Sequence, residues 1–350
     1  MKRRDFFIEE QVQATGGVPG MLIAGDVGGT KTSLAVYSRE GGMRQPLFEK
    51  MYYSADYDGL ENMVSEFMET FHVVADDAVF GVAGPVVGAR ATTTNLPWVI
   101  TVENLVRTLH LKSTTLLNDL EAVAYGVPLL SENDVCMINE GKERPGGTVG
   151  VIAPGTGLGE AFLLSGGTGL RAHASEGGHT DFAPAGDREI ELLRYLVKKY
   201  GHVSYERVCS GRAIPDIYEF LKAAGFGKEP AWLAAELSRS EDATQVIVHN
   251  ALDPKERGGL CRKTLDLFIS ILGAEAGNLA LKVMATGGIF IGGGIAPRII
   301  PLIREGPFME AFTHKGRFAR FMEGIPVRVI LNPRAALMGA AFYGMEHMNS

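Results

Sequence analysis

The sequence contains little cysteine, and its cysteines are widely spaced. Only Cys136, Cys209 and Cys261 occur in 350 residues, and no CxxC pair is present. This spacing argues against a structural zinc site or a disulfide framework. Free thiols are typical of a reducing compartment, so we expect a cytoplasmic protein.

Long hydrophobic runs and an excess of basic charge are also absent. The most apolar stretch, 265–284, is interrupted by Asp266, Glu275, Asn278 and Lys282, which predicts a buried amphipathic helix rather than a membrane span. The net charge of −7 implies no basic surface for nucleic acid. We therefore expect neither a nucleic-acid partner nor a membrane partner.

The first twenty residues lack the apolar segment of a signal peptide, because Asp5, Glu9 and Glu10 interrupt them. We expect residues 1–20 to be a loose extension that precedes the first strand at Met21. The remaining chain is longer than one hydrophobic core usually serves, so two domains are expected.

Apolar runs and helix-period patterns are mixed along the whole chain, which predicts the α/β class. The expected strands are 21–24, 33–37, 78–83, 114–117, 149–153 and 289–291. The expected helices are 120–125, 187–200 with Asp187 as N-cap, 262–284 and 335–344.

Glycine is abundant, with 44 residues that cluster in short runs. Such clusters suit tight turns where the backbone approaches a ligand. The first turn, Gly25-Asp26-Val27-Gly28-Gly29-Thr30, joins two strand-like runs into a predicted β-hairpin. Its amides and the Thr30 hydroxyl suit phosphate oxygens, and Asp26 suits Mg²⁺ held through water. The spacing matches neither a Walker A loop nor a convincing dinucleotide fingerprint.

Two further glycine turns follow apolar strands. Gly155-Thr156-Gly157-Leu158-Gly159 repeats the strand–glycine–strand pattern, and Gly292-Gly293-Gly294 follows a third strand. Together the turns predict a nucleotide clamp, with the β-phosphate at the first, the γ-phosphate at the second and adenosine near the third. The repeated hairpin also predicts two related halves.

Polar residues suited to a sugar occur at three places. Asn118-Asp119 ends a strand, where it is either a helix cap or a base that accepts a hydroxyl proton beside an orienting amide. Glu176 and His179 flank two glycines on a flexed loop, and such groups suit vicinal hydroxyls. Composition alone predicts that Glu206 is a solvated glutamate.

These motifs, taken in order, resemble the bacterial glucokinase family of the actin/hexokinase/Hsp70 superfamily. The resemblance covers about residues 21–345 and includes Asp181-Phe182-Ala183-Pro184, Glu206-Arg207-Val208 and Gly293-Gly294-Ile295-Ala296-Pro297-Arg298. It implies a two-domain actin-like (ribonuclease H-like) fold, with mixed sheets flanked by helices and a cleft between domains. The small domain would span 21–130, completed by the C-terminal helix 331–350, and the large domain would span 131–330.

The resemblance also implies ATP-dependent phosphorylation of the glucose 6-hydroxyl, with Mg²⁺ as cofactor and a homodimer as the assembly. Asp119 would be the base, and Asn118, Asp119, Glu176, His179 and Glu206 would contact glucose. Gly25 to Thr30 would form the ATP phosphate loop.

Departures from the family pattern leave alternatives open. Lys31 stands where a polar uncharged residue is frequent in the family, so a phosphate contact of Lys31 is only suggested. Loop 93–98 is similar in position to the family's sugar-side loop but differs in detail, so another hexose such as mannose or glucosamine is an alternative substrate. The zinc-binding ROK branch is disfavoured because no cysteine lies between Cys136 and Cys209. A non-catalytic sugar-sensing regulator is the third alternative.

Overall fold

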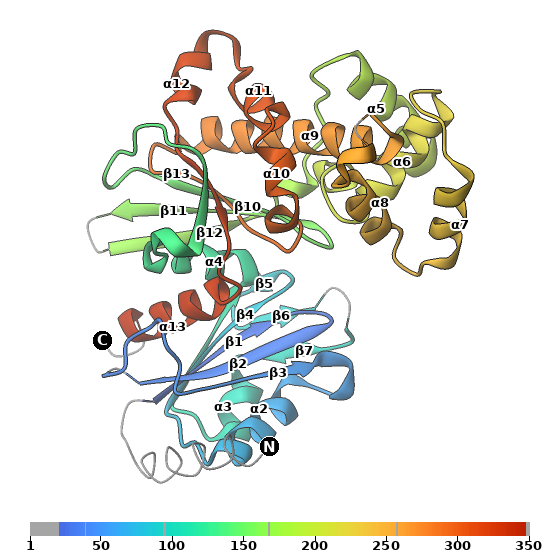
Figure 1. Cartoon of the computed structure of the whole chain (residues 1–350). Helices are drawn as coiled ribbons and strands as arrows, with labels where there is room; N and C mark the ends of the chain where they lie inside the picture. Colours follow the sequence, from blue (N-terminus) through green and yellow to red (C-terminus); the bar gives the residue numbers. More distant parts are fainter. Residues whose placement is uncertain (1–20, 39, 94–95, 167–168, 257, 348–350) are drawn as a thin grey trace. The chain divides into compact units, whose positions relative to one another are not determined.

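The computed structural model describes residues 21–38, 40–93, 96–166, 169–256 and 258–347. The predicted extension 1–20 and residues 94 and 95 of loop 93–98 lie outside the described residues. The chain forms two compact units, the first ending at Ser131 and resuming at Asn332, and the second running from Glu132 to Leu331 (Figure 1).

The first unit is built on a five-stranded sheet of order β3-β2-β1-β4-β8 and a small sheet of order β5-β6-β7. Its strands are β1 (Met21–Val27), β2 (Lys31–Ser38), β3 (Phe48–Tyr53), β4 (Asp77–Val82), β5 (Val86–Val87), β6 (Arg90–Thr92), β7 (Val99–Thr101) and β8 (Ser113–Asn118). Its helices are α2 (Leu60–Phe71), α3 (Val102–Leu109), α4 (Asp119–Gly126) and α13 (Ala335–His347), with short turns η1 (Ser54–Asp56) and η2 (Val127–Leu129).

The second unit is built on a six-stranded sheet of order β12-β11-β10-β13-β14-β9. Its strands are β9 (Val135–Asn139), β10 (Val149–Pro154), β11 (Leu158–Gly166), β12 (Gly169–Ser175), β13 (Gly288–Ile291) and β14 (Val327–Ile330). Its helices are α5 (Asp187–Tyr200), α6 (Ala213–Ala223), α7 (Ala231–Arg239), α8 (Ala243–Ala251), α9 (Leu260–Val283), α10 (Ile300–Ile303), α11 (Pro307–Thr313) and α12 (Ala319–Glu323). Its short turns are η3 (Glu132–Asp134), η4 (Gly177–His179), η5 (Tyr205–Arg207), η6 (Pro254–Glu256), η7 (Ala296–Ile299) and η8 (Gly316–Phe318).

The two large sheets share one topology. In the first, β1 pairs antiparallel with β2 and parallel with β4, which pairs parallel with β8. In the second, β10 pairs antiparallel with β11 and parallel with β13, which pairs parallel with β14. The α/β class, the two hairpins and the two related halves are therefore confirmed.

Each unit has its own core, and helix burial explains the apolar sequence patterns. The longest helix, α9, is long and apolar enough to cross a membrane, but 78% of its most apolar window is buried inside the fold. It is therefore a core helix, as its interrupted apolar pattern predicts. In the first unit, α13 is apolar on nearly every face because it packs against α4, β1 and β4.

Two local predictions are corrected. The first glycine turn is shorter than predicted, because β1 continues through Val27 and only Gly28, Gly29 and Thr30 lie between the strands. The N-cap of α5 is Gly186, and Asp187 is the first helical residue, where its charge favours the helix N-terminus without a side-chain cap.

Candidate active site

The first unit places its predicted phosphate turn at the carboxyl end of β1. Gly28, Gly29 and Thr30 form the turn, and the Ser54 hydroxyl donates to the Gly28 carbonyl at 2.8 Å while the Ser54 amide donates to the Thr30 carbonyl at 3.0 Å. Ser54 thus holds two carbonyl groups of the turn. Sequence reasoning missed Ser54, because no local pattern links it to a turn more than twenty residues away.

The other predicted residues of this segment belong to β1 itself. Gly25 is buried, and a Cβ added there would lie 2.5 Å from Phe80, so its lack of a side chain serves sheet packing. Val27 is fully buried. Asp26 is half-buried, and burial raises the pKa of its carboxyl to about 6. A carboxylate desolvated in this way fits a cation, so the residue suits the predicted Mg²⁺ site.

Asn118 and Asp119 lie at the carboxyl end of β8, on the same edge of the sheet. Asn118 is the N-cap of α4, and its Oδ1 accepts from the amides of Leu120 at 3.0 Å and Glu121 at 3.4 Å. The Glu121 side chain accepts from the Asn118 amide in return, which completes a capping box. The cap prediction for Asn118 is therefore confirmed, and its Nδ2 group, which donates to the Gly84 carbonyl, is the part that retains donor capacity.

Asp119 is the first residue of α4 and is half-buried. The positive end of the helix dipole favours a carboxylate at this position. Helix α4 packs closely against α13. A Cβ at Gly126 of α4 would overlap the backbone of α13, and a Cβ at Gly339 of α13 would overlap the backbone of α4. Close backbone packing of α4 and α13 therefore fixes where Asp119 stands.

The second unit brings the other two glycine turns together at the carboxyl ends of β10 and β13. Gly155, Thr156 and Gly157 join β10 to β11, and the Gly155 carbonyl accepts from the Gly211 amide at 2.8 Å. Gly293 has a φ of 77°, and a Cβ there would overlap the Pro154 carbonyl, so glycine is required. Gly294 follows in the same turn.

The predicted sugar residues of this unit stand on two short turns. Glu176 precedes η4, which contains His179, and both side chains are exposed, with His179 Nε2 3.9 Å from Glu176 Oε2. The glycines between them do not flex the loop. A Cβ at Gly177 would overlap the Glu160 carboxyl, and one at Gly178 would overlap the Leu158 carbonyl, so they permit close packing instead.

Glu206 lies in η5, and its sequence-based interpretation as a solvated glutamate is wrong. Its carboxylate is half-buried and accepts from the Leu158 amide at 3.0 Å, directly after the second glycine turn. A Cβ at Gly157 would overlap this carboxylate. The second unit thus brings Glu206 into contact with the turn that contains Gly155, Thr156 and Gly157.

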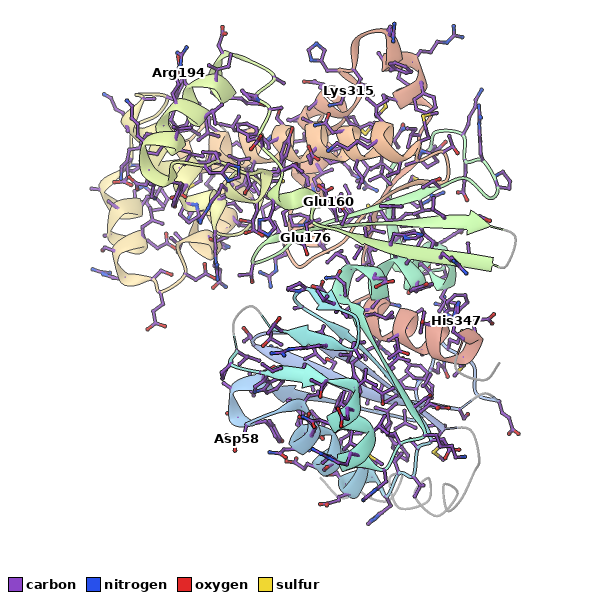
Figure 2. All side chains as sticks on the ribbon, turned by 180° about the vertical axis from the view of Figure 1, so that it is seen from behind. Asp58, Glu160, Glu176, Arg194, Lys315 and His347 are labelled. Atoms are coloured by element: carbon purple, nitrogen blue, oxygen red, sulfur yellow. The ribbon has the colours of Figure 1, made fainter. Side chains whose placement is uncertain are left out.

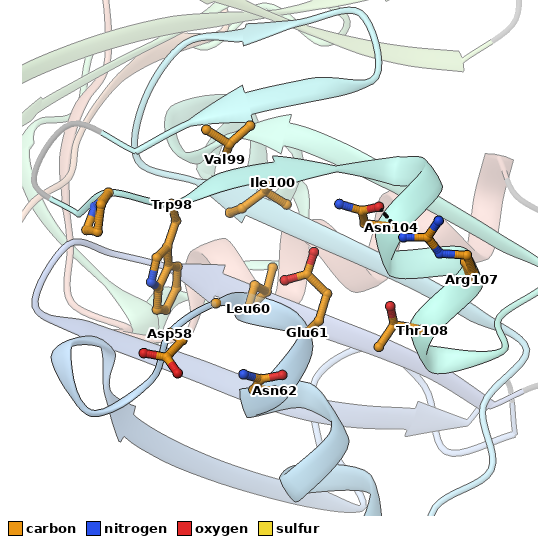
Figure 3. Close-up of a pocket in the computed structure, with 12 residues that line it drawn as sticks. Asp58, Leu60, Glu61, Asn62, Trp98, Val99, Ile100, Asn104, Arg107 and Thr108 are labelled. Carbon is orange, nitrogen blue, oxygen red and sulfur yellow. Dashed lines mark hydrogen bonds between the residues drawn. The ribbon is translucent and has the colours of Figure 1, made fainter.

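A cavity of about 330 Å³ lies elsewhere in the first unit, between α2, α3 and β7 (Figure 3). Asp58, Glu61, Trp98 and Arg107 are among its lining residues, and Arg107 donates to Asn104 at 2.9 Å. None of the residues assigned to glucose or phosphate contacts lines this cavity, although Pro97 and Trp98 of loop 93–98 do.

Sequence reasoning also missed two buried acids of the second unit. Glu160 on β11 is 2% exposed, and Glu275 on α9 is fully buried (Figure 2 labels Glu160 and Glu176). Glu160 is the one charged residue of β11, and Glu275 is one of the polar residues that interrupt the apolar stretch 265–284, and this was the available signal. The sequence does not indicate that the two face one another.

Comparison with known proteins agrees with this geometry. A sequence profile described as Glucokinase matches residues 23–347. The chain is 40% identical over 335 residues to a glucokinase of Nostoc punctiforme, covering 92% of this chain and 98% of that protein. It is 38% identical over 344 residues to a glucokinase of Synechocystis, covering 91% and 96%.

Solved structures show the same fold. A glucokinase from an Antarctic psychrotroph superposes with a TM-score of 0.79 at 30% identity, covering 92% of this chain and 98% of that one. A ROK family glucokinase from Streptomyces griseus, solved with glucose and AMPPNP, has a TM-score of 0.61 at 21% identity and covers 92% and 98%. The actin-like fold is therefore confirmed. The chain belongs to the bacterial glucokinase family and is a sugar kinase of the EC 2.7.1.2 class.

Proposed function

We propose that this enzyme transfers the γ-phosphoryl group of ATP to the 6-hydroxyl of glucose, with Asp119 as the general base. The observation that carries the proposal is the position of Asp119 as the first residue of α4, capped by Asn118 and on the same sheet edge as the Gly28–Thr30 turn. O6 forms the new bond to phosphorus as its proton passes to Asp119, and ADP leaves. Phosphoryl transfer requires little other covalent chemistry from a protein.

The remaining residues bind and orient the substrates. We assign the glucose hydroxyls to Asn118, Glu176, His179 and Glu206, and the phosphates to the turns Gly28–Thr30 and Gly155–Gly157, with adenosine near Gly293 and Gly294. Structures of relatives support the choice of substrates, since glucose is bound in the Balamuthia mandrillaris enzyme and glucose with AMPPNP in the Streptomyces griseus enzyme. Asp26 would hold Mg²⁺ through water, and the metal would neutralise phosphate charge.

A coupled assay of the purified protein with glucose, ATP and Mg²⁺ tests the proposal. We expect glucose 6-phosphate to form and kcat/KM for glucose to exceed the values for mannose and glucosamine. A higher kcat/KM for either of those sugars would contradict the assignment of glucose. No product from any of the three would contradict hexose phosphorylation altogether.

Two further expectations concern the oligomeric state and the cellular location of the protein. The homodimer and the cytoplasmic location that we predicted from the sequence are part of the proposal. Light scattering of the purified protein gives its molar mass, and a value equal to one chain of 37.7 kDa would contradict the dimer.

A further inference from the structure

Glu160 and Glu275 form a buried pair of carboxyl groups within the second unit. Glu160 is 2% exposed and Glu275 is fully buried, and they come from β11 and α9. Buried acids are rarely retained without a partner, because removing a carboxylate from water is costly. The pair therefore calls for a physical explanation.

The two acids differ in what surrounds them. Glu275 accepts from Asn278 Nδ2 at 2.8 Å and from Lys282 Nζ at 3.2 Å. Glu160 has no such donor: its Oε1 lacks a hydrogen-bond partner among the described residues, and the side chain that it faces is Glu275. Two carboxylates repel, whereas a protonated carboxyl donates to a carboxylate.

One proton shared by the pair satisfies both groups, and Glu160 is the group that carries it. Burial, followed by the charge of Glu275, raises the pKa of Glu160 to about 8. A protonated Glu160 can donate to a Glu275 oxygen, and Lys282 Nζ also donates to Glu275, at 3.2 Å.

The pair lies directly beneath both turns that carry the proposed sugar residues. The Glu160 carboxyl packs against the bare Cα of Gly177, next to Glu176 in the sequence, and a Cβ at Gly177 would overlap it. On the other side, Tyr205 forms a hydrogen bond with Glu275 and accepts from Asn278 Nδ2 at 2.9 Å. Tyr205 precedes Glu206 and donates its amide to the Thr180 carbonyl, which joins the two turns.

We propose that Glu160 and Glu275 are positioning residues which, by sharing one proton, hold the η4 and η5 turns in the geometry that binds the sugar. The inference rests on the proposed role of Glu176, His179 and Glu206 in glucose binding. Neither acid touches the sugar, so the pair acts through the two turns. Loss of the shared proton places two negative charges side by side in the core and displaces the turns.

The charged and titratable groups around the pair come from several elements. Lys282 faces it from α9, Tyr205 from η5 and Cys209 from the segment that follows, and burial beside the two acids raises the pKa of the Cys209 thiol. Lys315 donates to Asn278 Oδ1 at 2.6 Å, and desolvation lowers the pKa of its ammonium. The negative charge of Glu189 on α5 opposes this lowering of the Lys315 pKa.

The test is the pH dependence of the glucose KM in the full-length wild type and in three variants. If only the protonated pair binds sugar, KM for glucose in the wild type rises from pH 7 to pH 9 as Glu160 loses its proton, while KM for ATP stays constant. Glu160→Ala removes the donor and raises the glucose KM already at pH 7. Glu160→Gln keeps a neutral donor, so it restores a low KM at pH 7 and abolishes the rise up to pH 9.

Glu191 is an exposed glutamate of α5, and Glu191→Gln is the matched control. Its glucose KM should depend on pH as in the wild type. The inference is overturned if an active wild type shows a pH-independent glucose KM, if Glu160→Gln keeps the wild-type rise, or if KM for ATP rises in parallel. A wild type that phosphorylates no glucose contradicts the proposed function instead.

The shared proton has a readout that needs no turnover. Infrared spectroscopy of the wild type at pH 7 should show the carbonyl stretch of a protonated buried carboxyl, which Glu160→Gln removes. Absence of this band from folded wild-type protein overturns the shared proton regardless of the outcome with glucose.

Discussion

The two units use the same order of strands, yet they support their candidate site residues by different means. In the first unit Asn118 and Asp119 are held by the side-chain-to-backbone hydrogen bonds of a capping box and by the close backbone approach of α4 to α13. In the second unit Glu176, His179 and Glu206 stand on short turns above a network of buried ionisable side chains.

The difference has a physical consequence. Backbone contacts and a helix cap do not change their charge near neutral pH, so the support of Asp119 should be insensitive to pH there. A buried carboxyl pair binds or releases a proton, so the support of the sugar turns should respond to pH. The same sheet topology thus provides one rigid half and one half whose geometry depends on protonation.

The largest expected effect is at the base itself. Asp119→Asn retains the shape of the side chain at the start of α4 but cannot accept a proton, so kcat should fall by about 10²- to 10⁴-fold. Glucose affinity, measured by calorimetry, should change little. Asp58→Asn, on the cavity wall of the same unit, is the control and should keep wild-type kcat. A wild-type kcat for Asp119→Asn together with a large loss for Asp58→Asn would instead indicate that the active site is at that cavity.

The next effect tests the main-chain support. Gly339→Val places a side chain against the Ala122 carbonyl of α4, and overpacking of this kind costs about 1–3 kcal/mol of unfolding free energy. Urea unfolding measures the loss, and kcat should fall with it because α4 shifts. Gly166→Ala, at an open position on β11, should change neither quantity. If Gly339→Val has full stability, the α4–α13 contact does not fix Asp119.

A smaller effect separates the cap from the ligand role of Asn118. Asn118→Ala removes the acceptor for two helix amides and should cost about 1 kcal/mol in urea unfolding. Asn118→Ser keeps a capping oxygen and should retain most of this stability while weakening glucose binding. Equal glucose affinity in Asn118→Ser and the wild type would limit Asn118 to a structural role.

A separate effect concerns Asp26, a titrating group within the otherwise pH-insensitive half. Its folded pKa of about 6 exceeds the ordinary value of 3.8, so the folded state holds more protons than the unfolded state between these values. The stability contribution of this carboxyl is therefore complete below about pH 4 and is lost as pH rises through about 6.

Asp26→Asn should accordingly be more stable than the wild type at pH 7 to 8 and equal to it near pH 4, while its turnover falls because the Mg²⁺ position is lost. Thermal unfolding across this pH range measures the difference. Asp56→Asn, at an exposed position, is the control. A lower stability of Asp26→Asn at pH 7 would mean that a counter-charge stabilises the ionised carboxyl.

Much of the fold could be predicted because its signals are local. The strands at 21–24 and 149–153, the two hairpins and the helix at 120–125 were predicted from runs and periodicity within a few residues. The cap at Asn118 is equally local, since Asn118 and Glu121 are three residues apart. Boundaries were less accurate: β1 extends through Val27 because its ladder with β2 and β4 continues beyond the apolar run.

The candidate site was less predictable where it depends on distant contacts. Glu206 reads as solvated because its neighbours His202 and Arg207 are polar, yet it accepts from Leu158. Glu160 and Glu275 read as isolated charges, although β11 and α9 bring them together. A sequence pattern reports which face a side chain occupies, but not which segment lies opposite.

The sequence by itself determined the α/β class, the two hairpins and the glycine turns, because these follow from local pattern. It also offered Asp119, Glu176 and His179 as candidate site residues through their side-chain chemistry, whereas a sugar role for Glu206 came only from the family resemblance. Tertiary structure alone decided that Gly177 and Gly178 permit close packing and that Ser54 holds the first glycine turn. It also decided that the buried pair Glu160 and Glu275 lies beside the η4 and η5 turns. These features arise from packing between segments far apart in the chain, where burial replaces water and changes the charge that a side chain carries.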